Sequence, residues 1–195
     1  MTDEFFGTAS DGKIGMWIFL LADAMSFAGL LLGYGILRAG QPVWPLPSDH
    51  LGIPLTAALT FLLICSSVTM VFAVQAAMAD NKRRTLQFLG LTILGGIGFL
   101  CGQYVEYAEL IHEGITLSAC APVGCPSQFA STFFVVTGFH GLHVFSGVVY
   151  MICIFVATAR GKYEGGHYDK IEILGLFWHF VDLVWILVFT FVYLL

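Results

Sequence analysis

The sequence predicts an all-α membrane protein, a single bundle of five transmembrane helices. The chain of 195 residues is 58% hydrophobic and 11% charged, whereas an ordinary soluble domain is about 25% charged. Its apolar residues form five runs, and each is long enough for the roughly 20 residues of helix that cross a bilayer core. The runs are continuous, and this favours helices over barrel strands, in which polar and apolar residues alternate.

The predicted spans follow one another within one membrane domain that covers residues 1–195. They are residues 14–37, 54–78, 86–107, 130–159 and 173–195. Pro54 opens the second span, where its fixed φ suits a first helical turn. Glycines recur in the spans, among them Gly29 and Gly33 in the first and Gly95 and Gly102 in the third. Because glycine lets membrane helices approach closely, we expect the first and third spans to be packing elements.

The basic residues outside the spans predict how the chain lies in the membrane. Seven of the eight Lys and Arg residues precede the first span or follow the second and fourth, and only Arg38 follows the first. Since basic residues remain in the cytoplasm, we expect a cytoplasmic N-terminus and a periplasmic C-terminus. The polar, acidic start of the chain lacks the basic n-region of a cleavable signal peptide. The net charge of −5 is small and dispersed, so we expect no nucleic-acid partner.

Ionisable side chains deep inside the spans are the strongest pointers to function. Asp23 lies nine residues beyond the start of the first span, about 14 Å into the membrane at 1.5 Å per residue. A charge at that depth costs roughly 2.5–3.5 kcal/mol, so Asp23 must face protein, water or a partner. Two interpretations follow: a functional carboxylate in a lipid-binding cleft or proton path, or a structural hydrogen bond to a neighbouring helix.

Two pairs of polar residues share a helix face because their members stand three positions apart. His179 and Asp182 lie in the fifth span, where they could form a proton relay or a structural clasp between helices. His140 and His143 lie in the fourth, where hydrogen bonding between helices and metal ligation are both open interpretations. A bis-histidine haem would need a matching pair on a facing helix, and the sequence contains none, so we expect no metal.

A third polar group stands at the outer end of the third span. Gln103, Glu106 and Tyr107 lie there, with Glu106 about 30 Å along from the start of the span. That position predicts a group at the depth of the membrane–water interface, where tyrosine is a usual anchor.

Cys120 and Cys125 bracket the sequence CAPVGC in the third connection. That connection is predicted to lie outside the cytoplasm, where conditions are oxidising, so a disulfide is one interpretation. Free thiols and a thiolate metal site are the others. The chain contains no phosphate loop, nucleophile elbow or CxxCH haem attachment, and therefore no complete catalytic set.

Long motifs in the second half of the chain resemble those of cytochrome c oxidase subunit III. The segments STFFVVTGFHGLHV (131–144) and WHFVDLVW (178–185) carry the resemblance. Gln103, Glu106 and Tyr107 are similar to the family's Gln–x–x–Glu–Tyr. The segment GMWIFLLADAMSFAG (15–29) resembles the stretch that carries a mid-membrane carboxylate. The likeness covers nearly the whole chain. Three features depart from the family pattern: Asp23 stands where the family usually has Glu, the chain has five spans where the mitochondrial type has seven, and the connection with Cys120 and Cys125 resembles an insertion.

The resemblance implies an accessory subunit of a proton-pumping, oxygen-reducing complex in the bacterial inner membrane. Such a subunit holds no haem or copper, which belong to partner subunits. It packs beside the catalytic subunit I, binds phospholipid in a cleft, and sustains proton uptake and activity during turnover. The counterpart of Asp23 lines the lipid cleft. The residues expected to form a polar network between helices are Gln103, Glu106, Tyr107, His140, His143, His179 and Asp182.

Three other functions remain open from the sequence. The first is an accessory subunit of a quinol oxidase or of a nitric oxide reductase-associated complex. The second is a proton-coupled transporter of small solutes that uses Asp23 with His179 and Asp182. The third is a free-standing di-haem electron carrier.

Overall fold

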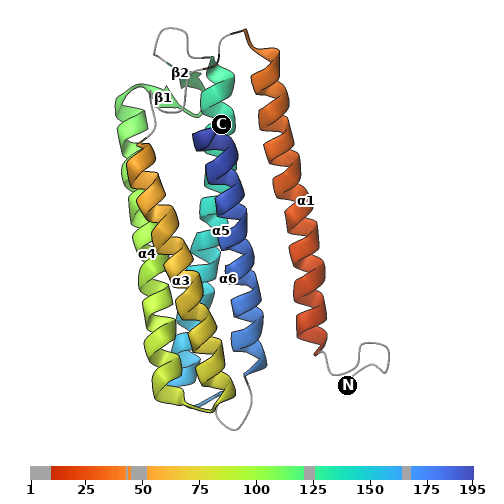
Figure 1. Cartoon of the computed structure of the whole chain (residues 1–195), viewed down its shortest axis with the longest axis vertical. Helices are drawn as coiled ribbons and strands as arrows, with labels where there is room; N and C mark the ends of the chain where they lie inside the picture. Colours follow the sequence, from red (N-terminus) through yellow and green to blue (C-terminus); the bar gives the residue numbers. More distant parts are fainter. Residues whose placement is uncertain (1–9, 43, 45–51, 121–125, 164–167) are drawn as a thin grey trace.

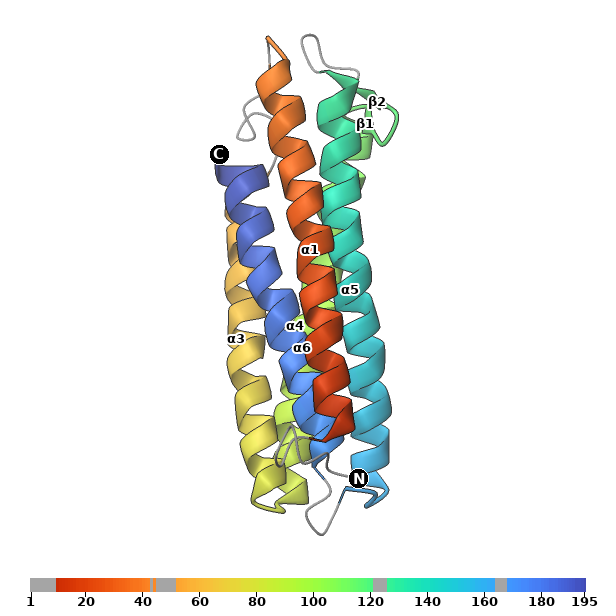
Figure 2. The ribbon, with the colours of Figure 1, turned by 90° about the vertical axis from the view of Figure 1, so that its right-hand side faces the viewer.

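The computed structural model describes residues 10–42, 44, 52–120, 126–163 and 168–195. Long helices run side by side along the long axis of the molecule (Figures 1 and 2). They are α1 (Asp11–Gly40), α3 (Ile53–Met78), α4 (Lys82–His112), α5 (Ser127–Ala159) and α6 (Asp169–Val188), which continues into the π-helix η1 (Phe189–Leu194). Within the described ranges, five helices are long and apolar enough to cross a membrane. The predicted five-helix fold is confirmed.

The ends of the helices follow local sequence signals. Pro54 stands in the first turn of α3, where its missing N–H leaves no bond unmade. Asn81 caps α4, and its side chain accepts a hydrogen bond from the backbone N–H of Arg84 at 3.2 Å. Asp80 between α3 and α4 takes a φ of 51°, a left-handed conformation that Asp tolerates better than most residues. The sharp turn there sets α3 and α4 side by side.

Small residues on α4 bring α3 very close. A Cβ placed on Gly95 would lie 2.7 Å from the Cβ of Ser66, and one on Gly102 would lie 2.4 Å from a methyl of Leu59. The close packing expected of the third span is therefore present. The same expectation for the first span is wrong, because a Cβ on Gly29 would meet nothing within 4 Å.

Helix α1 lies at the edge of the bundle. Figure 1 shows it standing apart from α3 and α4, and Figure 2 shows it lying along α5 and α6, which it contacts. Leu20, Asp23, Phe27 and Tyr34 are its buried residues, and they recur at helical spacing on one face. Large apolar side chains such as Met25, which is 70% exposed, cover the opposite face. A membrane or a partner protein must cover that face.

A short hairpin closes one end of the bundle, and the sequence did not predict it. Strands β1 (Ile115–Thr116) and β2 (Ala119–Cys120) pair in antiparallel fashion, with Ile115 opposite Cys120. The hydroxyl of Ser131 on α5 donates to the carbonyl of Leu117 at 2.7 Å, which ties the hairpin to the bundle.

Candidate functional site

The carboxyl group of Glu106 is the centre of a buried polar cluster. It accepts hydrogen bonds from the hydroxyls of Thr56 at 2.9 Å and Tyr193 at 2.8 Å, and from the amide of Gln103 at 3.3 Å. All four side chains are buried. The cluster joins α3, α4 and η1 near one end of the bundle, so Glu106 forms the expected hydrogen bonds between helices. The hydroxyl of Tyr107 pairs with that of Thr137 on α5 at 2.7 Å, which joins α4 to α5.

Two indole groups of α6 reach across to hydroxyls of α3. The Nε1–H of Trp178 donates to Ser66 at 3.1 Å, and that of Trp185 donates to Thr60 at 2.9 Å. Both indoles are fully buried, so each N–H needs a partner inside the protein. These bonds fix the register of α6 on α3.

His179 and Asp182 share a face of α6, as the spacing predicted, and that face meets α3. The Nδ1 of His179 lies 2.6 Å from the hydroxyl of Ser67 on α3. Asp182 is 8% exposed, and its Oδ1 atom has no hydrogen-bond partner among the described residues. Ser67 therefore joins His179 to α3, while Asp182 is buried beside it on the same face of α6.

His140 is fully buried and surrounded by aromatic rings. Its ring centroid lies 4.7 Å from that of Trp185, 5.8 Å from that of Phe99 and 6.3 Å from that of Phe27. Neither ring nitrogen has a hydrogen-bond partner in the described part of the chain. The expected hydrogen bond between helices is therefore wrong for His140, because its face of α5 meets aromatic carbon from three other helices.

Asp23 on α1 contacts His143 on α5. Its Oδ1 atom lies 3.2 Å from the Nε2 of His143, and the Nδ1 of that ring lies 2.8 Å from the backbone carbonyl of Phe139. The carbonyl can only accept, so Nδ1 carries a hydrogen. The contact with Asp23 then requires one further proton, on the imidazole or on the carboxyl group. The pair is net neutral in both cases, which suits its position at membrane depth.

Polar contacts also hold α1 at its two ends. Near its start, the amino group of Lys13 lies 2.8 Å from the carboxylate of Glu172 and 3.6 Å from that of Asp169. Near its end, the guanidinium of Arg38 donates to the backbone carbonyl of Leu195. Helix α1 is therefore attached at three levels, with the Asp23–His143 pair in the middle.

Apolar cavities separate these three levels along the seam between α1 and the C-terminal helix. One cavity, of about 380 Å³, lies between the Lys13 level and the Asp23–His143 level, and its walls include Trp17, Phe180 and His179. Another of about 550 Å³ lies toward the Arg38 level, with Tyr34 and Phe191 in its walls. Their volumes are large enough for part of a hydrocarbon chain.

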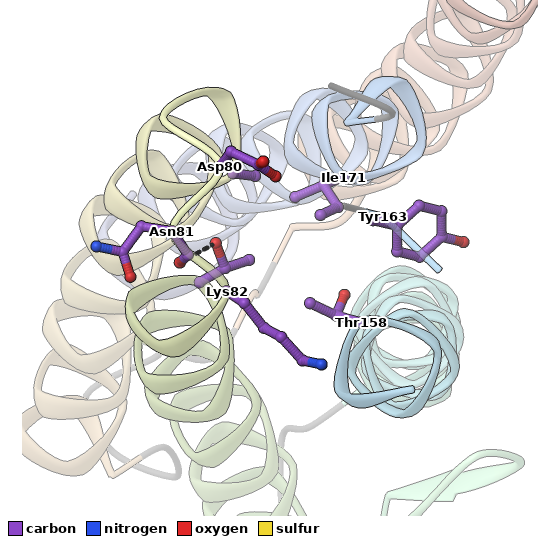
Figure 3. A pocket seen from close by; sticks show the side chains of 8 residues that line it. Asp80, Asn81, Lys82, Thr158, Tyr163 and Ile171 are labelled. Atoms are coloured by element: carbon purple, nitrogen blue, oxygen red, sulfur yellow. Dashed lines mark hydrogen bonds between the residues drawn. The ribbon is translucent and has the colours of Figure 1, made fainter. Parts of the chain in front are cut away.

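A small pocket at the end of the bundle brings the α3–α4 turn next to the ends of α5 and α6. Figure 3 shows Thr158, Tyr163 and Ile171 around it, with Asn81 and Lys82 opposite. Its volume of about 10 Å³ has room for about one water molecule. It is too small for a substrate.

The predicted disulfide falls partly outside the described residues. Cys120 is disulfide-bonded, and Cys125 lies outside the described residues, so their pairing stays a prediction. Among the described positions, no group of three or more His, Cys, Asp or Glu residues could hold a metal ion.

The structure places the predicted site residues in four separate parts of the bundle. Asp23 and His143 join α1 to α5, His179 and Asp182 face α3, His140 lies in the centre, and Glu106 lies near one end. Reasoning from the sequence missed the hydroxyl partners Thr56, Thr60, Ser66, Ser67 and Tyr193. Their polar atoms within apolar runs were the only signal available.

The chain is similar over nearly its whole length to known proteins of one family. The model of cytochrome c oxidase subunit III matches residues 6–195. "Cytochrome c oxidase subunit 3" of Corynebacterium diphtheriae is 34% identical over 93% of this chain and 86% of its own length. "Probable quinol oxidase subunit 3" of Staphylococcus saprophyticus is 31% identical, over 94% and 88%. "Cytochrome bo(3) ubiquinol oxidase subunit 3" of Pseudomonas putida is 34% identical, over 93% and 84%.

Proposed function

The chain belongs to the cytochrome c oxidase subunit III family and is a subunit III of a haem–copper oxidase, and from that premise we propose that it supports the catalytic subunit without carrying a redox centre. The haem and copper of the complex belong to its partners, chiefly subunit I. The isolated chain has no activity of its own. The transporter and di-haem interpretations give way to this family membership.

One observation carries the proposal: several of the buried polar groups form hydrogen bonds from one helix to another. Glu106 accepts hydrogen bonds from Thr56 on α3 and Tyr193 on η1, and His143 and His179 each bond a residue of another helix. His140, which could have been a haem ligand, is enclosed by aromatic rings. These groups stabilise a rigid bundle, and such a bundle suits an element that holds a partner subunit in place.

The electron donor of the complex is proposed to be cytochrome c, with quinol as the alternative. A relative named as a cytochrome c oxidase subunit and one named as a ubiquinol oxidase subunit are each 34% identical to this chain. Sequence identity therefore favours neither donor. The choice therefore depends on which reduced donor the purified complex oxidises.

The location is proposed to be the bacterial inner membrane, with a cytoplasmic N-terminus and a periplasmic C-terminus. The distribution of basic residues supports this orientation. The start of α1, the α3–α4 turn and the start of α6 lie at the same end of the molecule (Figure 1), and these regions contain Lys13, Lys82 and Lys170.

Asp23 is proposed to steady α1 beside bound phospholipid and so to sustain proton uptake and activity during turnover. Its contact with His143 lies between the two apolar cavities that separate α1 from the C-terminal helix. Acyl chains in those cavities would cover the apolar walls that the protein leaves open.

The test compares the purified complex with and without this subunit. We expect the two preparations to have the same haem spectrum, because the haem lies in partners. The complex without the subunit should pump fewer protons per electron and lose activity in fewer turnovers. An unchanged stoichiometry together with an unchanged lifetime would reject the proposed role.

A further inference from the structure

A groove opens on the surface of α3 and α4, beside the tight turn that joins them. Its volume is about 260 Å³, and residues near the end of α3, in the turn and near the start of α4 form its walls: Phe72, Gln75, Ala76, Ala79, Asn81, Arg84 and Phe88. Figure 1 shows α1 standing apart from these two helices. The α3–α4 groove is therefore separate from the cavities along α1.

The end of the groove nearest the turn carries hydrogen-bond donors and a positive charge. The side-chain oxygen of Asn81 accepts a bond from the backbone N–H of Arg84 at 3.2 Å, which leaves the amide N–H groups of Asn81 as donors. Figure 3 shows this amide directed away from Thr158 and the small pocket. No acidic residue lines the groove, and in the described part of the chain no carboxylate pairs with Arg84. Arg84 and the exposed amide of Gln75 are therefore open to an anion.

The other end of the groove is apolar. The rings of Phe72 and Phe88 lie against each other there, with centroids 5.3 Å apart. Phe72 is six residues from the end of α3 and Phe88 is six residues from the start of α4, so both lie about 9 Å along their helices from the turn. Phe72 is 45% exposed. The groove thus changes from cationic to apolar in the direction of the membrane interior.

An anionic phospholipid presents the complementary groups in the same order. Its phosphate accepts strong hydrogen bonds from guanidinium and amide groups, and its acyl chain covers the aromatic rings below. A small anion would leave the rings of Phe72 and Phe88 uncovered, and an uncharged chain would leave the charge of Arg84 without a counter-ion. Residues 80–84 include one acidic and three basic side chains, and basic pockets between membrane helices attract anionic headgroups.

We propose that the α3–α4 groove binds one anionic phospholipid. The phosphate lies among Arg84, Asn81 and Gln75, and one acyl chain packs against Phe72 and Phe88. The volume of about 260 Å³ equals that of eight or nine water molecules at about 30 Å³ each, enough for the phosphate and the upper part of that chain. The proposal makes this face of α3 and α4 a lipid-facing surface of the complex, and it does not depend on the role of Asp23.

Photocrosslinking in the purified oxidase complex tests the proposal. The complex is placed in bilayers of phosphatidylcholine that contain a small amount of phosphatidylglycerol with a diazirine in the upper part of its acyl chain. Mass spectrometry then locates the crosslinks. We expect them within residues 72–88, where a phosphatidylcholine probe with the same diazirine should give far fewer. Unlabelled phosphatidylglycerol should displace the probe, whereas inorganic phosphate at the same concentration should not.

The variants separate recognition in the groove from general surface charge. Arg84→Gln should weaken the labelling of residues 72–88 at least about tenfold, the factor for a lost hydrogen bond to a charged group. Arg83→Gln is the matched control, because Arg83 has the same charge but does not line the groove. It should weaken labelling clearly less, by at most about fivefold. Ala79→Leu should also reduce labelling, because it fills the groove without changing the charge. An unchanged haem spectrum shows that each variant still assembles.

Four results would overturn the proposal. The first is equal labelling of residues 72–88 by the two probes, and the second is an equal effect of Arg83→Gln and Arg84→Gln. The third is displacement by inorganic phosphate, which would assign the groove to a free anion. The fourth is wild-type labelling in Ala79→Leu, or no labelling of this segment in the intact complex, where another subunit would then cover it. None of these readouts is proton pumping or activity lifetime, so failure here is separate from failure of the proposed function.

Discussion

Replacing Tyr193 by Phe removes one hydrogen bond from the buried Glu106 cluster and leaves the aromatic ring in place. The hydroxyl lies 2.8 Å from the carboxyl group, and Tyr193 is 1% exposed. Hydrogen bonds between membrane helices contribute about 0.6 kcal/mol on average and about 1.7 kcal/mol at most. A short, fully buried bond to a carboxyl group belongs near the upper value. We therefore expect Tyr193→Phe to lower the free energy of unfolding by about 1.5 kcal/mol.

The assay is reversible unfolding of the chain in mixed micelles, followed by the fluorescence of its tryptophans. Tyr104→Phe is the control, because Tyr104 is 75% exposed and should change stability by less than about 0.5 kcal/mol. Thr56→Val removes a second donor to the same carboxyl group. Because both donors share Glu106, the double variant should depart from the sum of the single variants by at least about 0.5 kcal/mol. Additive effects, or a Tyr193→Phe protein as stable as the wild type, would refute the reasoning.

Three further predictions concern other parts of the bundle. Asp23→Ala should leave the haem spectrum of the complex unchanged but shorten its active lifetime during turnover, and a normal lifetime would show that Asp23 does not matter. His140→Phe should cost no more than overpacking by a somewhat larger ring, about 1–3 kcal/mol in the same unfolding assay, because no hydrogen bond of the imidazole is lost. A loss well above that range would mean that the imidazole is bonded. Gly95→Ala should destabilise the protein by about 1–3 kcal/mol through overpacking, because the new Cβ would lie 2.7 Å from that of Ser66. Gly29→Ala is the control and should show no such loss, because a Cβ there would meet nothing within 4 Å.

The helices could be predicted from the sequence because membrane spans are a strong compositional signal. Continuous apolar runs leave helices as the favoured way to satisfy the backbone in lipid. The partners of the polar residues could not be predicted, because they depend on how each helix is rotated. Asp23 was open to a functional or a structural interpretation, and its contact with His143 became visible only when α1 was placed on α5.

The two errors have the same cause. His140 and His143 are equivalent in spacing, yet only His143 reaches a polar partner on another helix, while His140 faces three aromatic rings. The glycines of the first and third spans also look alike in sequence. Only those of α4 face a neighbouring helix closely, since α3 is joined to α4 by a tight turn while α1 lies at the edge of the bundle (Figure 2).

Isolation of a tagged form of the chain from native membranes tests the central claim most directly. The account predicts that the chain copurifies with a large haem-bearing subunit and that, once separated and still folded, it contains neither iron nor copper in stoichiometric amount. Stoichiometric iron or copper in the folded chain alone would contradict it.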